Sequence, residues 1–386
     1  GGGAAGVLPG ENDTEVSKDP VLLENFRGVS VAACGSSHSA FVIGGRLYTY
    51  GSNKYSQLGR QVPEGASSGN PELVSFGDGE EPVVTQISLG GCHSAAITEG
   101  GVLWTWGWGG SFWSGVGGLG NGSKDLVDRP KKVQQFLDSG ERVAQVACGG
   151  QHTIVLTEEG RIYSTGKGEF GLLGHGDTRD EAEFREIEYF YDANDSILAP
   201  GETPKIVKVG TGNNFSAAMS SAGELWVWGR NDYGQLGLGE EAMGDLYSAE
   251  RFPRLVSSLP TEGKRIVDFA CGEYQLVVRT DKGTLHEWGG KTWLEPHEVH
   301  MPEKHEDKLK TVVALASGEN FCFALAADGT LFSWGAKSSG CLAHGESCPK
   351  IVVEPTPVAP GTFGGQRLVG IAAAGARCVA VGLEEE

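Results

Sequence analysis

The most regular feature of the chain is the alternation of short apolar runs with glycine-centred turns. Residues 94–98 and 102–106 are two such runs, and a polar residue with two glycines separates them. Short β-favouring runs that are punctuated by Gly and Asp are typical of antiparallel hairpins. The pattern continues to the end of the chain, so we predict β-strands throughout.

One glycine phrase repeats along the chain and defines the repeating unit. Each copy has small or apolar residues, a glycine that we call the first anchor, two variable residues and often a histidine. A second anchor, usually Trp-Gly, follows 16 or 17 residues later, and a third, Gln-Leu-Gly or a variant, follows in most copies. The first anchors are Gly35, Gly90, Gly149, Gly212, Gly272, Gly318 and Gly375. A spacing of 46 to 63 residues indicates an array of supersecondary units, so residues 1–386 are interpreted as one repeat domain.

The number of strands in each unit restricts the fold. Four short strands with apolar residues on both faces cannot bury those faces within a single small sheet. Sheets stacked radially around an axis bury them against their neighbours. We therefore predict an all-β fold, a seven-bladed β-propeller of four-stranded blades.

The ends of the chain are expected to close this ring. The seventh copy stops after residues 379–382, before its Trp-Gly strand. We expect the N-terminal segment to pair with the C-terminal segment, which removes an exposed sheet edge. Aligning residues 6–9 with the third anchor places Gly1 at the Trp-Gly position. On this alignment the strand before Gly1 is missing, so we expect the natural gene to extend upstream or a leader to have been removed.

Charge and composition exclude several classes of function. The formal net charge is −19, and no basic tail or stripe is present, which argues against direct binding of duplex DNA. No stretch approaches 18 consecutive apolar residues, so no membrane span is expected. Cys34, Cys148 and Cys271 occupy the same position in three repeats. We interpret them as small buried apolar residues in a reducing, intracellular compartment.

These phrases together resemble the regulator of chromosome condensation repeat family. The resemblance rests on Cys-Gly-x-x-His-Ser/Thr, then Gly-x-Leu-Tyr/Trp-x-Trp-Gly, then Gly-Gln-Leu-Gly, with good matches at residues 148–174 and 212–239. It extends over about residues 1–382 and implies a seven-bladed propeller. Members of the family include an exchange factor for the nuclear GTPase Ran, a plant ultraviolet photoreceptor, substrate-binding parts of ubiquitin ligases and organellar assembly factors.

The resemblance leaves a choice between an exchange factor and a binding platform. No Trp stands directly after the first anchors, which disfavours the photoreceptor, and we expect no ligase domain. Exchange would use polar and acidic loops on one propeller face. The histidines His38, His93 and His152 stand in such loops. We expect them to be structural, each bonding to a turn in its own blade.

An aromatic insertion interrupts the second blade. Five extra residues separate its second and third anchors. Trp108, Phe112 and Trp113 lie beyond the regular strand, among glycines. Such residues are typical of an interface hot spot, but they could equally fold back over the blade edge. Both interpretations stay open.

A second departure, residues 177–205, is interpreted as an acidic and aromatic insertion. Eight carboxylates and two arginines lie within residues 177–195. Phe184, Tyr189 and Tyr191 are its candidate contacts for a basic protein partner, and Phe190 lies among them. The alternative is a solvated charge run.

The fifth blade lacks its Gly-Gln-Leu-Gly arm and carries His297, His300 and His305 instead. Pro302 breaks any helix that would align these histidines, so no metal site is expected. The Gly-x-Gly-x-x-Gly match at residues 166–171 opens no helix, so no nucleotide cofactor is expected either. No catalytic residue is predicted.

We therefore predict a non-enzymatic scaffold that binds one or more proteins, as in a multi-subunit assembly. Guanine nucleotide exchange on a small GTPase is the alternative. The missing initiator Met and the family analogy place a mitochondrion or another organelle before the cytoplasm. The sequence identifies neither the partner nor the face that binds it.

Overall fold

The computed structural model describes most of the chain. The described residues are 2–6, 21–62, 67–79, 81–111, 115–194, 196–199, 202–242, 248–259, 264–301, 305–336, 342–345 and 348–383. They form seven four-stranded antiparallel sheets and one two-stranded sheet. Pro302 and Cys341 lie outside the described residues.

The first four of these sheets follow one another along the chain. The first sheet contains β3 (Val29–Cys34), β4 (His38–Ile43), β5 (Arg46–Ser52) and β6 (Ser67–Leu73). The second contains β7 (Val84–Leu89), β8 (His93–Thr98), β9 (Val102–Gly107) and β12 (Val127–Lys132). The third contains β13 (Val143–Cys148), β14 (His152–Thr157), β15 (Ile162–Gly166) and β16 (Glu181–Glu186). The fourth contains β17 (Ile206–Thr211), β18 (Phe215–Ser220), β19 (Leu225–Arg230) and β20 (Ala249–Leu255).

The remaining three sheets complete the arrangement. The fifth contains β21 (Ile266–Cys271), β22 (Gln275–Thr280), β23 (Leu285–Gly289) and β24 (Trp293–Val299). The sixth contains β25 (Val312–Ser317), β26 (Phe321–Ala326), β27 (Leu331–Ala336) and β28 (Ile351–Pro357). The seventh combines the chain ends, with β29 (Arg367–Ala374), β30 (Arg377–Leu383), β1 (Gly2–Gly6) and β2 (Val21–Arg27).

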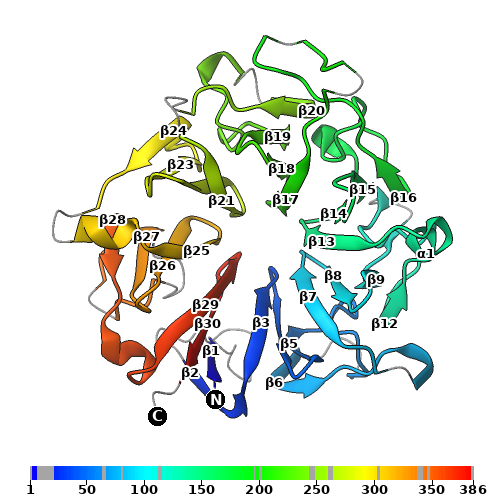
Figure 1. Ribbon diagram of the computed structural model, residues 1–386. Helices are drawn as coiled ribbons and strands as arrows, with labels where there is room; N and C mark the ends of the chain where they lie inside the picture. The colour runs from blue at the N-terminus through cyan, green and yellow to red at the C-terminus, as the bar shows by residue number, and fades with distance from the viewer. Residues whose placement is uncertain are drawn as a thin grey trace.

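The first strand of each sheet lies nearest a central opening, as β3, β7, β13 and their equivalents show in Figure 1. The core lies between neighbouring sheets rather than within one. One cluster, for example, joins Ala40 and Val42 of the first sheet to Trp104 and Trp106 of the second. This packing explains the apolar residues on both faces of the strands, and it confirms the predicted all-β propeller.

The seventh sheet corrects the predicted alignment of the N-terminus. Strand β1 lies between β30 and β2, and Gly6 pairs with Val379. In the third sheet the second-anchor glycine Gly166 pairs with His152, three residues after the first anchor. The equivalent position in the seventh sheet therefore follows Gly6. The prediction that Gly1 occupies it and that its strand is missing was wrong, because residues 2–6 are that strand. Pairing of the two chain ends is confirmed.

Helices are few and short among the described residues. They are α1 (Gln134–Ser139), α2 (Glu306–Leu309) and the 3-10 turns Gly77–Gly79, Glu169–Gly171, Glu240–Ala242 and Pro360–Phe363. No helix in the described ranges has the length and apolarity to cross a membrane. A small hairpin, β10 (Gly110–Ser111) and β11 (Gly115–Val116), projects from the second sheet.

The anchor histidines connect neighbouring sheets. His38 Nε2 lies 2.7 Å from Ser94 Oγ, and His93 Nε2 lies 2.8 Å from Thr153 Oγ1. His152 Nε2 makes the same contact with Ser216 of the fourth sheet, at 2.9 Å. The expected structural role holds, but the expected partner in the histidine's own blade was wrong, because each ring reaches the next sheet.

These contacts also determine the tautomer of the histidines. The Ser94 hydroxyl donates to the carbonyl of Gln57 (2.8 Å), and Thr153 donates to that of Gly118 (2.7 Å). Each hydroxyl oxygen must then accept from Nε2–H, so the rings are neutral with the proton on Nε2. Burial lowers the pKa of His38 to about 3 and that of His93 to about 4.

The third anchors form arms that cover the next sheet. We call the segment around each Gln-Leu-Gly, or its variant, an arm. Its leucine is buried, as Leu58 and Leu236 show. Its backbone accepts the indole N–H of the next sheet. Trp106 donates to Gln57 O (2.9 Å), Trp228 to Leu172 O (2.9 Å) and Trp288 to Gln235 O (3.1 Å).

Four of the arms are also bonded to their own third strand. In the first, second, third and sixth sheets the residue two before the second anchor carries a hydroxyl that donates to the carbonyl of the arm leucine. Thr49 reaches Leu58 O at 2.8 Å, and Ser164 reaches Leu173 O at 2.7 Å. Thr105 and Ser333 repeat the contact with Leu119 O and Leu342 O, both at 2.8 Å. An arm is thus fixed between two sheets.

The cysteines at the repeat position fit the predicted interpretation. Cys34 and Cys148 are buried, Cys271 is half-buried, and all three are in the reduced thiol form. Burial raises the pKa of Cys148 and of Cys271 to about 12, so both remain protonated and unreactive at neutral pH.

Candidate protein-interaction face

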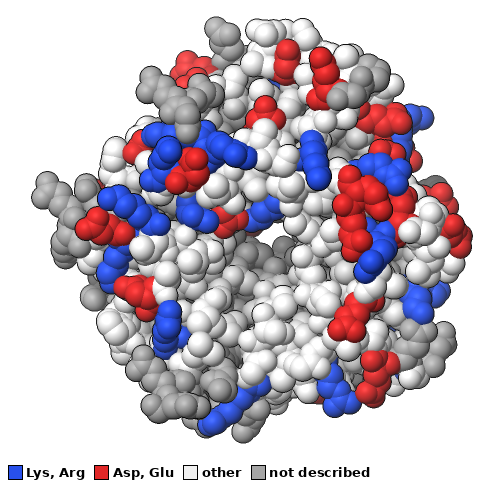
Figure 2. Space-filling model, viewed as in Figure 1, with Lys and Arg blue, Asp and Glu red and all other residues white. Residues whose placement is uncertain are grey.

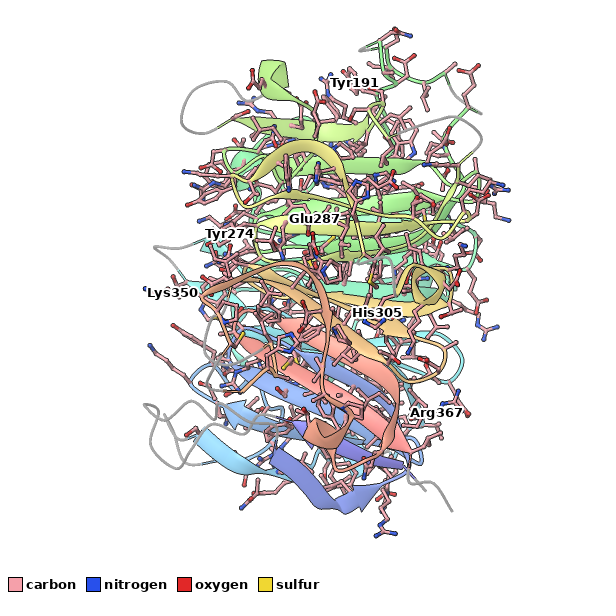
Figure 3. All side chains as sticks on the ribbon, turned by 90° about the vertical axis from the view of Figure 1, so that its left-hand side faces the viewer. Tyr191, Tyr274, Glu287, His305, Lys350 and Arg367 are labelled. Atoms are coloured by element: carbon pink, nitrogen blue, oxygen red, sulfur yellow. The ribbon has the colours of Figure 1, made fainter. Side chains whose placement is uncertain are left out.

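The two faces of the propeller differ in what they contain. First-anchor turns and second-anchor connections meet on one face, which we call the anchor face. The turns between second and third strands, and the connections to the next sheet, lie on the opposite face. Figure 3 shows the molecule edge-on, with Tyr274 at the anchor face and Tyr191 and Arg367 at the other.

Backbone hydrogen bonds join the first-anchor loops around the axis. Gly91 N–H donates to Gly149 O (3.0 Å), and Gly150 N–H donates to Asn213 O (3.0 Å). Further along, Glu273 N–H donates to Gly318 O (2.9 Å), and Glu319 N–H donates to Gly375 O (2.7 Å). The cavity that these loops line measures about 50 Å³. Such a volume holds a water molecule or two and is too small for a drug-sized ligand.

Beside this ring, aromatic and cationic side chains from three sheets meet on the anchor face. We call Phe170, Arg230, Tyr233, Tyr274 and Lys291 the Tyr233 cluster. The rings of Tyr233 and Tyr274 stack with centroids 4.7 Å apart. Arg230 lies 4.9 Å from the Phe170 ring and 5.6 Å from the Tyr233 ring, and Lys291 Nζ lies 4.5 Å from Tyr233. Cation–π contacts therefore hold a half-buried aromatic surface in place.

Ion pairing and acidic neighbours surround the Tyr233 cluster. Arg230 binds Asp232 through two hydrogen bonds of 2.6 and 2.5 Å. On the axial side, Asn213 donates to Glu273 Oε1 at 3.1 Å. Burial raises the pKa of Glu273, and the nearby Glu319 raises it further. A partner that brings a cation to this edge would relieve the repulsion between the two carboxylates.

The aromatic insertion lies on the same face. Trp108 is half-buried, with its ring centroid 6.5 Å from that of Tyr55. The inserted segment forms the hairpin β10–β11, which Asp180 fixes through a 2.9 Å bond from the Val116 N–H. Phe112 and Trp113 lie outside the described residues, so their expected role stays a prediction.

The segment 177–205 is not a single insertion. Its residues 181–186 form β16, the outer strand of the third sheet. The part after β16 runs beside β20 of the fourth sheet, where Tyr191 forms bridges to Arg254 and Ile197. The acidic loop predicted from composition is therefore divided by a sheet strand.

Three aromatic residues of that segment have different environments. Phe184 is 4% exposed and packs on Phe136, so it belongs to the core and cannot contact a partner. Its inclusion as a candidate was wrong, because alternation along β16 turns this residue inward. Tyr189 is 52% exposed and Tyr191 is half-buried, and both rings contact Phe252. Tyr191 lies on the face opposite Tyr274 and therefore opposite the anchor face, where the aromatic insertion lies. The predicted residues Trp108 and Tyr191 thus do not belong to one site.

The Tyr233 cluster was missed by the sequence analysis, although the repeat contains a signal for it. An aromatic residue follows the second anchor by four positions in four copies, as Tyr55, Phe170, Tyr233 and Trp293. The first three also precede their third anchors, Gly59, Gly174 and Gly237, by four residues, whereas Trp293 belongs to the sheet that lacks this anchor. The rings of Trp293 and His297 stack, with their centroids 3.5 Å apart.

The described residues contain no group of His, Cys, Asp and Glu arranged for a metal.

Figure 2 shows the face opposite the anchor face, and charged residues form no broad basic area there. Lys and Arg alternate with Asp and Glu near the rim, and a few charged residues reach the upper edge of the central hollow.

The sequence and the fold of the chain are similar to those of known proteins. The family model of the RCC1-like domain matches residues 1–380. The chain belongs to the RCC1-like domain family. A relative from Arabidopsis thaliana, the mitochondrial RCC1 domain-containing protein RUG3, is 31% identical over 343 residues, which cover 85% of this chain and 67% of RUG3. The ultraviolet-B receptor UVR8 of the same plant is 28% identical, over 83% of this chain and 68% of UVR8.

Longer relatives contain the RCC1-like domain as one part. The mouse E3 ubiquitin-protein ligase HERC2 is 26% identical over 92% of this chain, and the match spans 7% of HERC2. Among solved structures, Prp20p of Saccharomyces cerevisiae has a TM-score of 0.82 at 19% identity, over 100% of this chain and 92% of Prp20p. Human WBSCR16 has a TM-score of 0.77 at 23% identity, over 100% of this chain and 99% of the other. At these identities the two structures establish the fold.

Proposed function

We propose that this RCC1-like domain is a non-enzymatic platform that binds proteins through its anchor face. The observation that supports this proposal is the Tyr233 cluster, where Tyr and Arg are held half-buried by stacking and ion pairing. Rigid Tyr, Trp and Arg side chains are the residues most enriched in interface hot spots. The half-buried Trp108 extends the same face toward the second sheet.

The partner is a protein or a protein assembly. Prp20p, which shares the fold, binds Gsp1p and histones, and this supports a protein partner. The name of RUG3 supports a mitochondrial location. We also infer that each four-stranded sheet is one blade of a seven-bladed ring, because successive first-anchor loops are joined in order around the axis.

Alanine substitution of Tyr233 together with Tyr274 is expected to reduce partner recovery at least tenfold in copurification from the source cells. A tenfold loss corresponds to about 1.4 kcal/mol, which is within the range of one hot-spot residue. Trp108→Ala should reduce the recovery several-fold. Thermal unfolding should remain cooperative, since these side chains lie outside the inter-sheet core.

Tyr189→Ala is the matched control because Tyr189 is an exposed tyrosine outside this cluster. Loss of the partner with Tyr189→Ala, and not with the Tyr233 and Tyr274 substitutions, would move the binding site off the anchor face and contradict the proposal. Guanine nucleotide exchange is the alternative that the same protein can test. Release of fluorescent GDP from a panel of small GTPases, accelerated well above background, would replace the platform with an exchange factor.

A further inference from the structure

The fifth sheet is missing its arm, and a cavity lies where an arm would lie. A tight turn at residues 290–292 connects β23 directly to β24. A cavity of about 370 Å³ opens between the fifth and sixth sheets on the left-hand side of Figure 1. Its walls include Trp288, Phe321 and Trp334. In the first and fourth sheets the buried arm leucine occupies the equivalent place, with the indole of the following sheet above it.

Glu287 takes over one function of the missing arm. It stands two residues before the second anchor, where Thr49, Thr105, Ser164 and Ser333 donate to an arm carbonyl. Its Oε2 accepts the Trp334 indole N–H at 2.6 Å, a bond that an arm carbonyl accepts in three other places. Figure 3 shows Glu287 on the side formed by the fifth and sixth sheets. The carboxylate thus replaces the acceptor of the arm but does not fill its volume.

The rim of this cavity is apolar and open to solvent. Trp293 is 39% exposed, Ile351 is 63% exposed and Val353 is 80% exposed, and all three line the opening. Exposed apolar residues that adjoin a hollow mark a place for a ligand or partner. Gln275 and Asn320 add polar groups to the wall.

The first arm indicates the chemistry of the group that would face Glu287. Arg60, at the end of that arm, donates to the carbonyl of Thr49 at 3.2 Å. Thr49 is the residue whose position Glu287 takes in the fifth sheet. An occupant that docks as the first arm docks would bring a guanidinium to a position where this chain provides a half-buried carboxyl. Burial raises the pKa of Glu287, and a cation beside it would be stabilised by ionised Glu287.

We propose that this cavity binds a peptide segment of a partner protein in place of the missing arm. An aliphatic side chain, equivalent to the arm leucine, lies against Trp334, and a basic residue two positions later reaches Glu287. The partner thereby completes the fifth sheet, as the intrachain arms complete the others. The proposal goes beyond the platform function, since it names a second site and the chemistry of its ligand.

The test uses the full chain and a fluorescein-labelled peptide with the sequence of residues 53–60, which is the first arm. Fluorescence polarisation should show saturable binding that weakens as salt is added, because one contact is ionic. Replacing the peptide leucine by serine should weaken binding at least tenfold, and replacing its arginine by glutamate should do the same. Glu287→Gln in the protein should weaken binding about fivefold.

Val353→Asp should weaken peptide binding at least tenfold without unfolding the protein, because residue 353 is exposed. Val313→Asp is the matched control, since Val313 is 54% exposed on β25 and does not line the cavity. No saturable binding up to millimolar protein, or equal binding by the Glu287→Gln, Val353→Asp and parent proteins, would overturn the proposal. The probe peptide reports this cavity alone, whereas partner recovery after substitution of Tyr233 and Tyr274 reports the platform.

Discussion

Acidification from pH 7 to pH 5 is expected to lower the free energy of unfolding by about 2 kcal/mol for each of three buried histidines. Burial lowers the pKa of His38 and of His152 to about 3, and that of His93 to about 4. In the unfolded chain the same rings titrate near the ordinary histidine pKa of 6.5. Between these values the unfolded state binds protons that the folded state excludes. Stability should therefore be constant above about pH 7 and fall as the pH drops toward about 4.

Urea unfolding at several pH values measures this slope. A domain with a typical stability of about 5–15 kcal/mol should approach its unfolding midpoint near pH 5. The chain itself suggests the test variant, because Phe215 and Phe321 occupy the histidine position in two other repeats. His152→Phe should reduce the dependence of the unfolding free energy on pH by the equivalent of one bound proton. Val313→Ala, at an exposed residue without a titratable group, serves as the control and should leave the slope unchanged. Equal slopes in all three proteins would show that the buried histidines do not cause the pH dependence of stability.

The strands could be predicted from the repeated glycines because the backbone geometry of the turns requires a glycine at these positions. The second-anchor glycines adopt positive φ, such as 109° at Gly51 and 103° at Gly107, which only glycine adopts easily. The apolar runs 94–98 and 102–106 lie within β8 and β9. Strand β1 was placed wrongly because its sequence, Gly-Gly-Ala-Ala-Gly, has no apolar alternation. Only its pairing with β30 and β2 defines it as a strand.

Contacts between repeats could not be predicted from one repeat. The partner of His38 lies 56 residues away, and that of His93 lies 60 residues away. The Tyr233 cluster likewise combines loops of the third, fourth and fifth sheets. Phe184 shows the opposite error, since its acidic neighbours suggested an exposed loop although the residue alternates into the core. Composition describes a segment, whereas burial depends on which sheet the segment joins.

Gly237→Ala is expected to destabilise the protein by about 3 kcal/mol or more. Gly237 has φ of 65°, a conformation that costs an L-residue about 1–2 kcal/mol. A Cβ at this position would also lie 2.6 Å from Trp288 Nε1, whose N–H donates to Gln235 O. The collision would displace the indole and break the bond between the fourth arm and the fifth sheet. Thermal and urea unfolding measure the loss.

Two further variants separate collision from backbone strain. Trp288→Leu removes the ring whose Nε1, Cδ1 and Cε2 atoms lie 2.6 to 2.8 Å from the added Cβ, so Gly237→Ala should cost about 1–2 kcal/mol less in the Trp288→Leu background than in the parent. If the effects of the two substitutions on the unfolding free energy are additive, the backbone conformation alone explains the loss of stability. Ala343 is the natural control, because it occupies the equivalent arm position at φ of 58°. The third strand of the sheet that follows Ala343 is Gly2–Gly6, which contains no tryptophan. Ala343→Gly should therefore change stability by less than about 1 kcal/mol, since relief of strain opposes the added freedom of the unfolded chain. A glycine is thus required in the arm where an indole lies above it, and alanine is tolerated where none does.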